Sequence, residues 1–247
     1  MVAPVRFWAT VSPMSFYTQF ADSYESIFPF SASIDAFLRR YLPVPGARVL
    51  DVGCGTGHYA GALAADGYDV LAVDLDPAMI AYAQAHYPDA DFRVLDMRDI
   101  GSLEMGFDTV ICIGNTAAHL TQGEFARFVE AVNGVRRPGA SWILQVMNWD
   151  YVVTQESVTF PVIEGKGGVT FYRTYHSISP AQVTFATRLE VDGRVVFEDA
   201  VPLYPLSSDE IIRLHHAQGF ELIEHVGSYG GAAFDPGSFS ANIFVFR

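Results

Sequence analysis

Basic residues are scarce in this chain of 247 residues. Fifteen Lys and Arg stand against 28 Asp and Glu, Lys166 is the only lysine, and the net charge is −13. A nucleic-acid-binding surface needs a basic stripe along the phosphate backbone, and a membrane-surface anchor needs a polybasic cluster; the sequence contains neither. We therefore expect no nucleic-acid partner and no membrane partner.

Cysteine and long apolar runs are also scarce. Cys54 and Cys112 are the only cysteines, and no C-x-x-C pair or Cys/His cluster occurs, so the sequence predicts no disulfide framework and no metal site. No apolar run reaches the ~18 residues of a membrane-spanning helix. We expect a cytoplasmic protein in which residues 1–13, which lack the features of a secretory signal, form a flexible extension.

The most informative pattern is the segment 49–57, which reads Val-Leu-Asp-Val-Gly-Cys-Gly-Thr-Gly. An apolar run passes Asp51, and three glycines then recur at every second position before a helical pattern begins at His58. This pattern predicts a buried strand that turns tightly into a helix, so that a ligand can lie directly against the backbone. Asp74 ends the next apolar run, at about the spacing from which an acid reaches a ribose hydroxyl.

The spacing of the glycines separates two classes of nucleotide ligand. Dinucleotide sites use G-x-G-x-x-G, whereas the third glycine comes one residue early here. Asp51 would also repel a phosphate, but its carboxylate would suit an ammonium group. A nucleoside with an amino-acid tail therefore fits better than a dinucleotide, and a nicotinamide-dependent oxidoreductase is the weaker alternative.

Apolar runs that alternate with helical patterns organise the first 150 residues. Such strands, apolar on both faces, indicate a parallel sheet with helices on both faces. The pattern predicts a helix over 121–135, followed by a turn at Pro138-Gly139. The expected strands are 48–52, 70–73, 92–95, 107–113 and 142–147.

The periodicity changes to two after residue 150. Residues 169–175 and 183–189 alternate, and Asp192-Gly193 has the composition of a hairpin turn. We expect residues 151–205 to form an antiparallel β lid over the acceptor site. The core then consists of residues 14–150, including a helical N-terminal cap, together with 206–247, where a helix capped by Ser207 or Ser208 precedes two paired strands.

The pattern Asp51-x-Gly53-x-Gly55-x-Gly57 resembles motif I of the class I S-adenosylmethionine-dependent methyltransferases. The resemblance covers nearly the whole chain. It implies an α/β fold with a Rossmann-like, seven-stranded, mostly parallel sheet and an antiparallel last strand. The small β lid would then be an insertion after strand five.

The resemblance also implies a set of contacts with the cofactor, S-adenosylmethionine. It places Asp51 near the ammonium group, Asp74 at the two ribose hydroxyls, which a carboxylate suits, and Asp96 at the adenine amino group. For the aromatic residues Tyr17 and Tyr24, which would close over the cofactor, core packing is the alternative. The other expected cofactor residues are Gly53, Cys54 and Gly55 along the methionine part, Leu75 and Met79 beside the adenine, Met97 and Ile113.

Two segments resemble the acceptor side of glycine N-methyltransferase-like enzymes. They are residues 113–120, which contain the catalytic candidates Asn115 and His119, and residues 146–151. Those enzymes carry an arginine that binds the substrate carboxylate at the position of Met147, and an uncharged thioether cannot bind a carboxylate. A lid arginine, Arg173 or Arg188, could substitute, although a solvated or structural arginine is the commoner case. The expected acceptor-binding residues are Asn148, Trp149, Tyr151, Arg173 and His176.

The lid argues for a small acceptor, because it would exclude a polymer from the strand ends. Residues 229–236 also resemble the sugar amine N-methyltransferases. We therefore expect methyl transfer to an amine, or less readily a hydroxyl, of a small metabolite, with S-adenosylhomocysteine as product. A hydroxyl acceptor would need a base such as His119 or His176. A non-catalytic S-adenosylmethionine-binding protein is the alternative, and the sequence leaves a homo-oligomer open.

Overall fold

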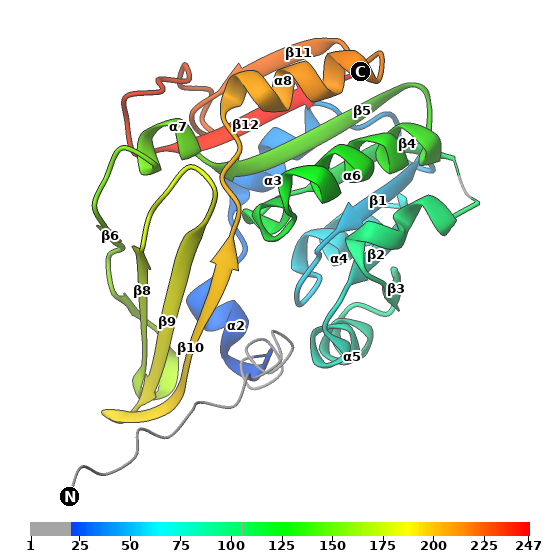
Figure 1. Cartoon of the computed structure of the whole chain (residues 1–247). Helices are drawn as coiled ribbons and strands as arrows, with labels where there is room; N and C mark the ends of the chain where they lie inside the picture. The colour runs from blue at the N-terminus through cyan, green and yellow to red at the C-terminus, as the bar shows by residue number, and fades with distance from the viewer. Residues whose placement is uncertain (1–20, 105) are drawn as a thin grey trace, which may run out of the picture.

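The computed structural model describes residues 21–104 and 106–247. A seven-stranded sheet forms its centre, in the order β11-β12-β5-β4-β1-β2-β3 (Figure 1). Strands β1 to β5 are parallel, whereas β12 is antiparallel to both β5 and β11. The strands are β1 (Arg48–Val52), β2 (Asp69–Asp74), β3 (Asp91–Val94), β4 (Phe107–Cys112), β5 (Arg136–Met147), β11 (Leu222–Val226) and β12 (Ala241–Phe246).

The strand order reverses between β1 and β4, and this reversal positions the site. From β1 the chain continues to β2 and β3 on one side, and β4 and β5 follow on the other. Ligands of open α/β sheets bind at the carboxyl ends of the strands at such a reversal. The segment after β1, which contains the three glycines, lies at this point.

Helices cover both faces of the sheet, as the sequence predicts. On one face, α6 (Gln122–Val135) and α8 (Ser208–Ala217) pack on a core that includes Leu50, Val110 and Leu144. On the other face, residues that alternate with these along the strands, such as Val49, Ile111 and Ile143, contact a second set of helices. That set is α3 (Ala32–Arg39), α4 (His58–Ala65) and α5 (Pro77–His86).

Helix starts follow their sequence signals. The Asp76 carboxylate accepts hydrogen bonds from the N–H groups of Ala78 and Met79 at the start of α5, with proline at the first helical position. At the start of α6, Thr121 and Glu124 form a reciprocal capping box. Ser207 caps α8 by accepting from the Glu210 N–H.

One expectation about local structure is wrong. The turn predicted at Pro138-Gly139 is part of strand β5, which begins at Arg136 directly after α6. The two residues lie where the register between β5 and β4 shifts, and Gly139 has φ +78°. The described part of the expected helical N-terminal cap contains two helices. They are α2 (Ala21–Ile27) and α3, and α3 ends before Tyr41.

A second, antiparallel sheet is inserted between β5 and α8, which confirms the predicted fold class. Its strands are β8 (Val169–His176), β9 (Val183–Val191) and β10 (Arg194–Leu203), with the short strands β6 (Val158–Thr159) and β7 (Ile163–Glu164) on β8. The Asp192-Gly193 turn joins β9 to β10 with φ of +49° and +73°, as a two-residue hairpin requires. We call this sheet the lid; α7 (Trp149–Val152) leads into it.

The lid packs against the N-terminal helix α2. Phe171 and Leu189 of the lid form one buried cluster with Ile27 of α2 and Met79 of α5. In Figure 1, α2 correspondingly lies between the lid and the lower end of the central sheet. No helix in the described parts of the chain is long and apolar enough to span a membrane.

Two glycine substitutions test the packing around α4. A Cβ at Gly61 would overlap the ring of Tyr87, whereas a Cβ at the exposed Gly134 of α6 would meet nothing within 4 Å. Gly61→Ala should therefore lower the free energy of unfolding by about 1–3 kcal/mol through overpacking. Gly134→Ala should raise it by about 0.5–1 kcal/mol through helix propensity. Urea denaturation measures both, and an equal effect of the two variants would contradict this account of α4.

Candidate active site

The glycine turn, residues 53–57, connects β1 to α4 at the point where the strand order reverses. Gly53, Gly55 and Gly57 have φ of +74°, +55° and +81°, a backbone region that side chains disfavour. The N–H groups of Gly53 and Cys54 both donate to the carbonyl of Val73, at 2.7 and 3.1 Å. These bonds fix the turn against the end of β2.

Asp74, the last residue of β2, is held by the turn itself. One carboxylate oxygen accepts from the Gly55 N–H at 2.8 Å, and the other accepts from the Asp76 N–H at 3.0 Å. Burial raises the pKa of Asp74, and these backbone hydrogen bonds oppose the shift. A carboxylate has about four acceptor sites, so it can still accept from further donors such as hydroxyls.

Asp51 places a second carboxylate beside the turn, inside β1. Its residue is 5% exposed, and burial raises the pKa of its carboxyl to about 7. The one charged neighbour that adds to this shift is Asp74, which has the same sign. A buried carboxylate next to a like charge is stabilised by a cation, so the pair fits a positively charged ligand.

Tyr24 of α2 lies over the turn. Atoms of its ring lie 3.5 Å from the position that a Cβ on Gly55 would occupy. Burial and the charge of Asp74 raise the pKa of Tyr24, so its hydroxyl keeps its proton at neutral pH. Its contact with the cofactor stays a prediction, and Tyr17 lies outside the described residues.

The apolar positions predicted to contact the cofactor differ in their surroundings. Leu75 is 45% exposed next to Asp74, whereas Met79 is 1% exposed and packs with Ile27 and Phe171 in the cluster under the lid. Met97 and Ile113 are partly buried against opposite faces of the sheet. Of these four residues, Leu75 is therefore the one with an exposed apolar side chain.

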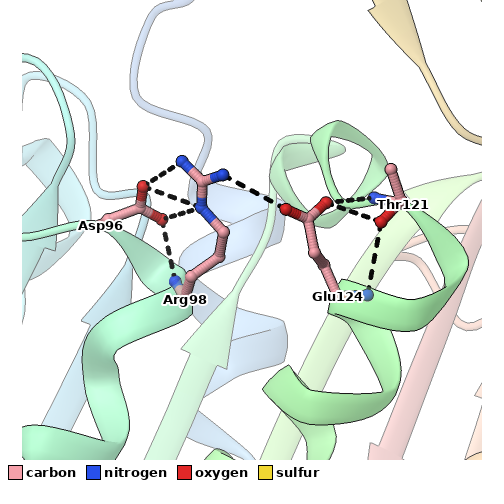
Figure 2. A network of polar contacts seen from close by, with 4 residues as sticks. All are labelled: Asp96, Arg98, Thr121 and Glu124. Atoms are coloured by element: carbon pink, nitrogen blue, oxygen red, sulfur yellow. Dashed lines mark hydrogen bonds and ion pairs between the residues drawn. The ribbon is translucent and has the colours of Figure 1, made fainter.

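Asp96, after β3, is engaged by a neighbouring arginine (Figure 2). Its carboxylate accepts from the Arg98 N–H at 2.9 Å and from the Arg98 guanidinium, which lowers the pKa of Asp96. Arg98 also contacts Glu124 at 3.2 Å, and Glu124 accepts from the Thr121 N–H at 2.9 Å. A contact between Asp96 and an adenine amino group stays a prediction, and Arg98 would share that carboxylate.

Asn115 joins three elements at the carboxyl ends of the strands. It follows β4 with φ of +64°, its amide oxygen accepts from the Met147 N–H at 2.9 Å, and its amide nitrogen donates to the Tyr175 hydroxyl at 3.4 Å. Asn115 therefore connects β4, β5 and the lid. His119 ends the nearby turn η2 (Thr116–His119), where burial lowers its pKa and keeps the imidazole neutral at pH 7.

Two of the predicted acceptor-binding residues are buried in the scaffold. Asn148 is fully buried and donates to the carbonyls of Asp235 and Ser238 at 2.9 and 2.8 Å. Trp149 is 1% exposed and stacks on Tyr175, with ring centroids 5.5 Å apart. These contacts show that Asn148 and Trp149 hold the lid and the C-terminal loop in place; acceptor contacts by them stay a prediction.

The other predicted acceptor residues lie in the lid and near it. Tyr151 is partly buried and meets the ring of Phe239 edge-on. His176 is exposed at the end of β8, 3.1 Å from the Ser177 hydroxyl. Arg173 lies on the same strand, among aromatic rings.

Tyr175 is central to this region, although the sequence analysis did not single it out. It stacks on Trp149, contacts Phe160 and Phe185, and accepts the hydrogen bond from Asn115. Its place in the alternating run 169–175, on the same face as Phe171, was the available signal. Across residues 21–104 and 106–247, no group of three or more His, Cys, Asp or Glu residues could hold a metal ion.

Comparisons with known proteins agree with this geometry. A family model described as a methyltransferase domain matches residues 49–139. The glycine/sarcosine N-methyltransferase of Parasynechococcus marenigrum (strain WH8102) is 31% identical over 228 residues, which cover 85% of this chain and 77% of that enzyme. The solved structure of a S-adenosylmethionine-dependent methyltransferase from Clostridium acetobutylicum ATCC 824 has a TM-score of 0.78 and 14% identity, covering 94% of this chain and 98% of that one.

Other curated relatives match over a shorter stretch. Mouse glycine N-methyltransferase is 32% identical over 124 residues, which cover 43% of this chain and 42% of the enzyme. The ubiquinone biosynthesis O-methyltransferase of Xylella fastidiosa (strain 9a5c) is 33% identical over 134 residues, which cover 47% of this chain and 53% of the enzyme. The chain thus spans about half the length of these two relatives.

The reversed strand order and the glycine turn define a Rossmann-like, nucleoside-binding protein. The similarity over most of the chain then shows that it belongs to the class I S-adenosylmethionine-dependent methyltransferases. The residues present fit this cofactor: the buried carboxylate of Asp51 suits its positive charge, and the remaining acceptor capacity of Asp74 suits its ribose.

Removing the Asp74 carboxylate should weaken cofactor binding. We expect Asp74→Ala to lower the affinity for S-adenosylhomocysteine by about 1.5–3 kcal/mol, the scale of a hydrogen bond to a charged group. Asp69→Ala is the matched control, because Asp69 lies at the opposite end of β2 with a mostly exposed side chain. Calorimetry that gives the same affinity for the wild type and Asp74→Ala would remove Asp74 from the site.

The raised pKa of Asp51 predicts a pH dependence. The folded chain holds this proton up to about pH 7, whereas an unfolded Asp releases it near pH 4. The free protein should therefore lose stability as the pH rises from about 4 to 7, because the folded state binds more protons than the unfolded state. Affinity for S-adenosylhomocysteine should rise over the same range, because its ammonium pairs with the ionised carboxylate.

Asp51→Asn should flatten both profiles. Melting temperatures of the free protein and calorimetric affinities between pH 5.5 and 8 measure the effect. If the wild-type affinity does not change with pH in this range, Asp51 does not bind the ammonium group.

Proposed function

We propose that this protein transfers the methyl group of S-adenosylmethionine to an amine nitrogen of a small metabolite. The observation that carries the proposal is the pair of carboxylates, Asp51 and Asp74, at a glycine-rich turn where the strand order reverses. The glycine/sarcosine N-methyltransferase to which the chain is similar supports an amine as the acceptor.

The protein contributes placement and exclusion of water. When bound, S-adenosylmethionine would supply a methyl group on a sulfonium, and the acceptor would form a bond to that methyl carbon as the S–C bond breaks and S-adenosylhomocysteine leaves. The glycine turn and its two carboxylates hold and orient the cofactor, while Tyr24 and the lid keep water from the reacting atoms. Correct placement of two reactants can lower a barrier by about 7–11 kcal/mol, and a neutral amine needs no strong base.

The lid supports a small acceptor. Tyr175 on its inner face contacts Asn115 at the end of β4, and Phe171 packs against α2. The lid and α2 together therefore stand over the strand ends that would meet the acceptor. A folded protein or a nucleic-acid strand would have to displace both.

A hydroxyl acceptor is the second candidate, and His119 is the observation that favours it. Burial keeps its imidazole neutral at pH 7, which is the form that accepts a proton. The ubiquinone biosynthesis O-methyltransferase of Xylella fastidiosa is among the similar proteins.

A methyl-transfer assay on a panel of small amines, alcohols and phenols, read by mass, separates these candidates. His119→Asn should change the rate with an amine by no more than a few-fold, but should lower the rate with a hydroxyl by about 10²–10⁴-fold if His119 is the base. His216→Asn, at an exposed position of α8, is the control. Tight binding of S-adenosylhomocysteine without transfer to any member of the panel would favour a non-catalytic role instead.

A further inference from the structure

The lid carries one arginine on each face of the strand pair β8–β9. Arg188 is exposed, forms an ion pair with Glu190 and lies over the ring of Tyr172. Arg173, in contrast, shares its face with the buried residues Phe171 and Tyr175. Of these two arginines, only Arg188 has a carboxylate partner among the residues that the structure describes.

The guanidinium of Arg173 is surrounded by aromatic rings. It lies 4.9 Å from the ring centroid of Phe160, 5.7 Å from that of Phe28 and 5.9 Å from that of Phe171. One terminal nitrogen donates to the carbonyl of Pro161 at 3.3 Å, whereas the buried Nε has no hydrogen-bond partner. Burial lowers the pKa of Arg173, yet an arginine keeps its charge in proteins.

Contacts on both sides place Arg173 over the acceptor side of the site. Phe28, which faces the guanidinium, packs on Tyr24 with ring centroids 5.1 Å apart, and Tyr24 covers the glycine turn. Two residues along β8, Tyr175 contacts Asn115 at the end of β4. The inner face of the lid thus brings a partly buried cation between the cofactor turn and the ends of the strands.

We propose that Arg173 binds a carboxylate of the methyl acceptor, so that the acceptor is an amine that also carries a carboxylate, as amino acids do. This inference rests on the proposed function. Guanidinium groups match carboxylates with two parallel hydrogen bonds, and a partly buried cation with a free N–H gains most from such a partner.

The charge balance favours a carboxylate over a phosphate. The site already holds Asp51 and Asp74, and the one unpaired guanidinium on the inner face of the lid can neutralise a single negative charge. A dianionic phosphate would keep an uncompensated charge in partly buried surroundings. Met147, at the end of β5, is uncharged and cannot bind a carboxylate, so Arg173 would be the residue that does.

Binding to the protein saturated with S-adenosylhomocysteine tests this proposal without turnover. Calorimetry or ligand-observed NMR compares amino acids, such as glycine and β-alanine and their larger homologues, with the corresponding amides and with aminoalkyl phosphates. We expect at least one amino acid to bind at least about tenfold more tightly than its amide, because only the acid forms the charged pair.

The variants Arg173→Met and Arg173→Lys are compared with Arg188→Met as the matched control. Arg173→Met should abolish the preference for the acid, Arg173→Lys should keep part of it, and Arg188→Met should leave it unchanged. In the mass-based transfer assay, Arg173→Met should raise the KM for the acid at least about tenfold. Affinity for S-adenosylhomocysteine should be the same in all variants, which reports that the fold and cofactor site are intact.

Four binding results would overturn the inference. They are equal binding of acids and amides, preferred binding of the phosphates, no binding of any amino acid in the panel, or an acid preference that survives in Arg173→Met. Failure of the proposed function is distinct from these: the wild type would then not bind S-adenosylhomocysteine, or would transfer no methyl group to any amine. Efficient methylation of amines without a carboxylate would leave the proposed function standing and remove the role of Arg173.

Discussion

The hydrogen bond from the Gly55 N–H to the Asp74 carboxylate is the contact on which the site depends. It joins the turn after β1 to the last residue of β2. The carbonyl of Val73, also in β2, accepts hydrogen bonds from Gly53 and Cys54 of the turn. Because Gly53, Gly55 and Gly57 have no Cβ atoms, a neighbouring group can approach the backbone closely at these positions. Helix α4 begins directly after this turn, and Tyr24 packs over it.

Charge is unevenly distributed between the two ends of the site. The buried pair Asp51 and Asp74 makes the cofactor end negative, and burial already holds the pKa of Asp51 near 7. On the inner face of the lid, the guanidinium of Arg173 makes the opposite end positive. In the proposed reaction this polarity would orient an amino-acid acceptor, with its carboxylate toward the lid and its amine toward the cofactor.

Much of the fold could be predicted because its signals are local. The glycine spacing, the Asp76-Pro77 helix start, the Thr121 capping box and the Asp192-Gly193 hairpin each act within a few residues. The turn predicted at Pro138-Gly139 was wrong because this pair lies within β5, where the register with β4 shifts. Such a shift depends on the pairing with another strand and has no local signal. Met79 is buried by the packing of α2 and the lid, and its contact with the adenine stays a prediction.

By itself, the sequence determined the type of site: two acids and three glycines at fixed spacing require a turn that accepts a nucleoside with a positive charge. Only the tertiary structure decided which side chains face each other across it. It engaged Asp96 with Arg98, buried Asn148 and Trp149, and set Tyr175 against Asn115. Alternation along β8 determines which of its residues share a face of the lid. What this face packs against depends on contacts between segments more than a hundred residues apart, such as that of Phe28 with Arg173.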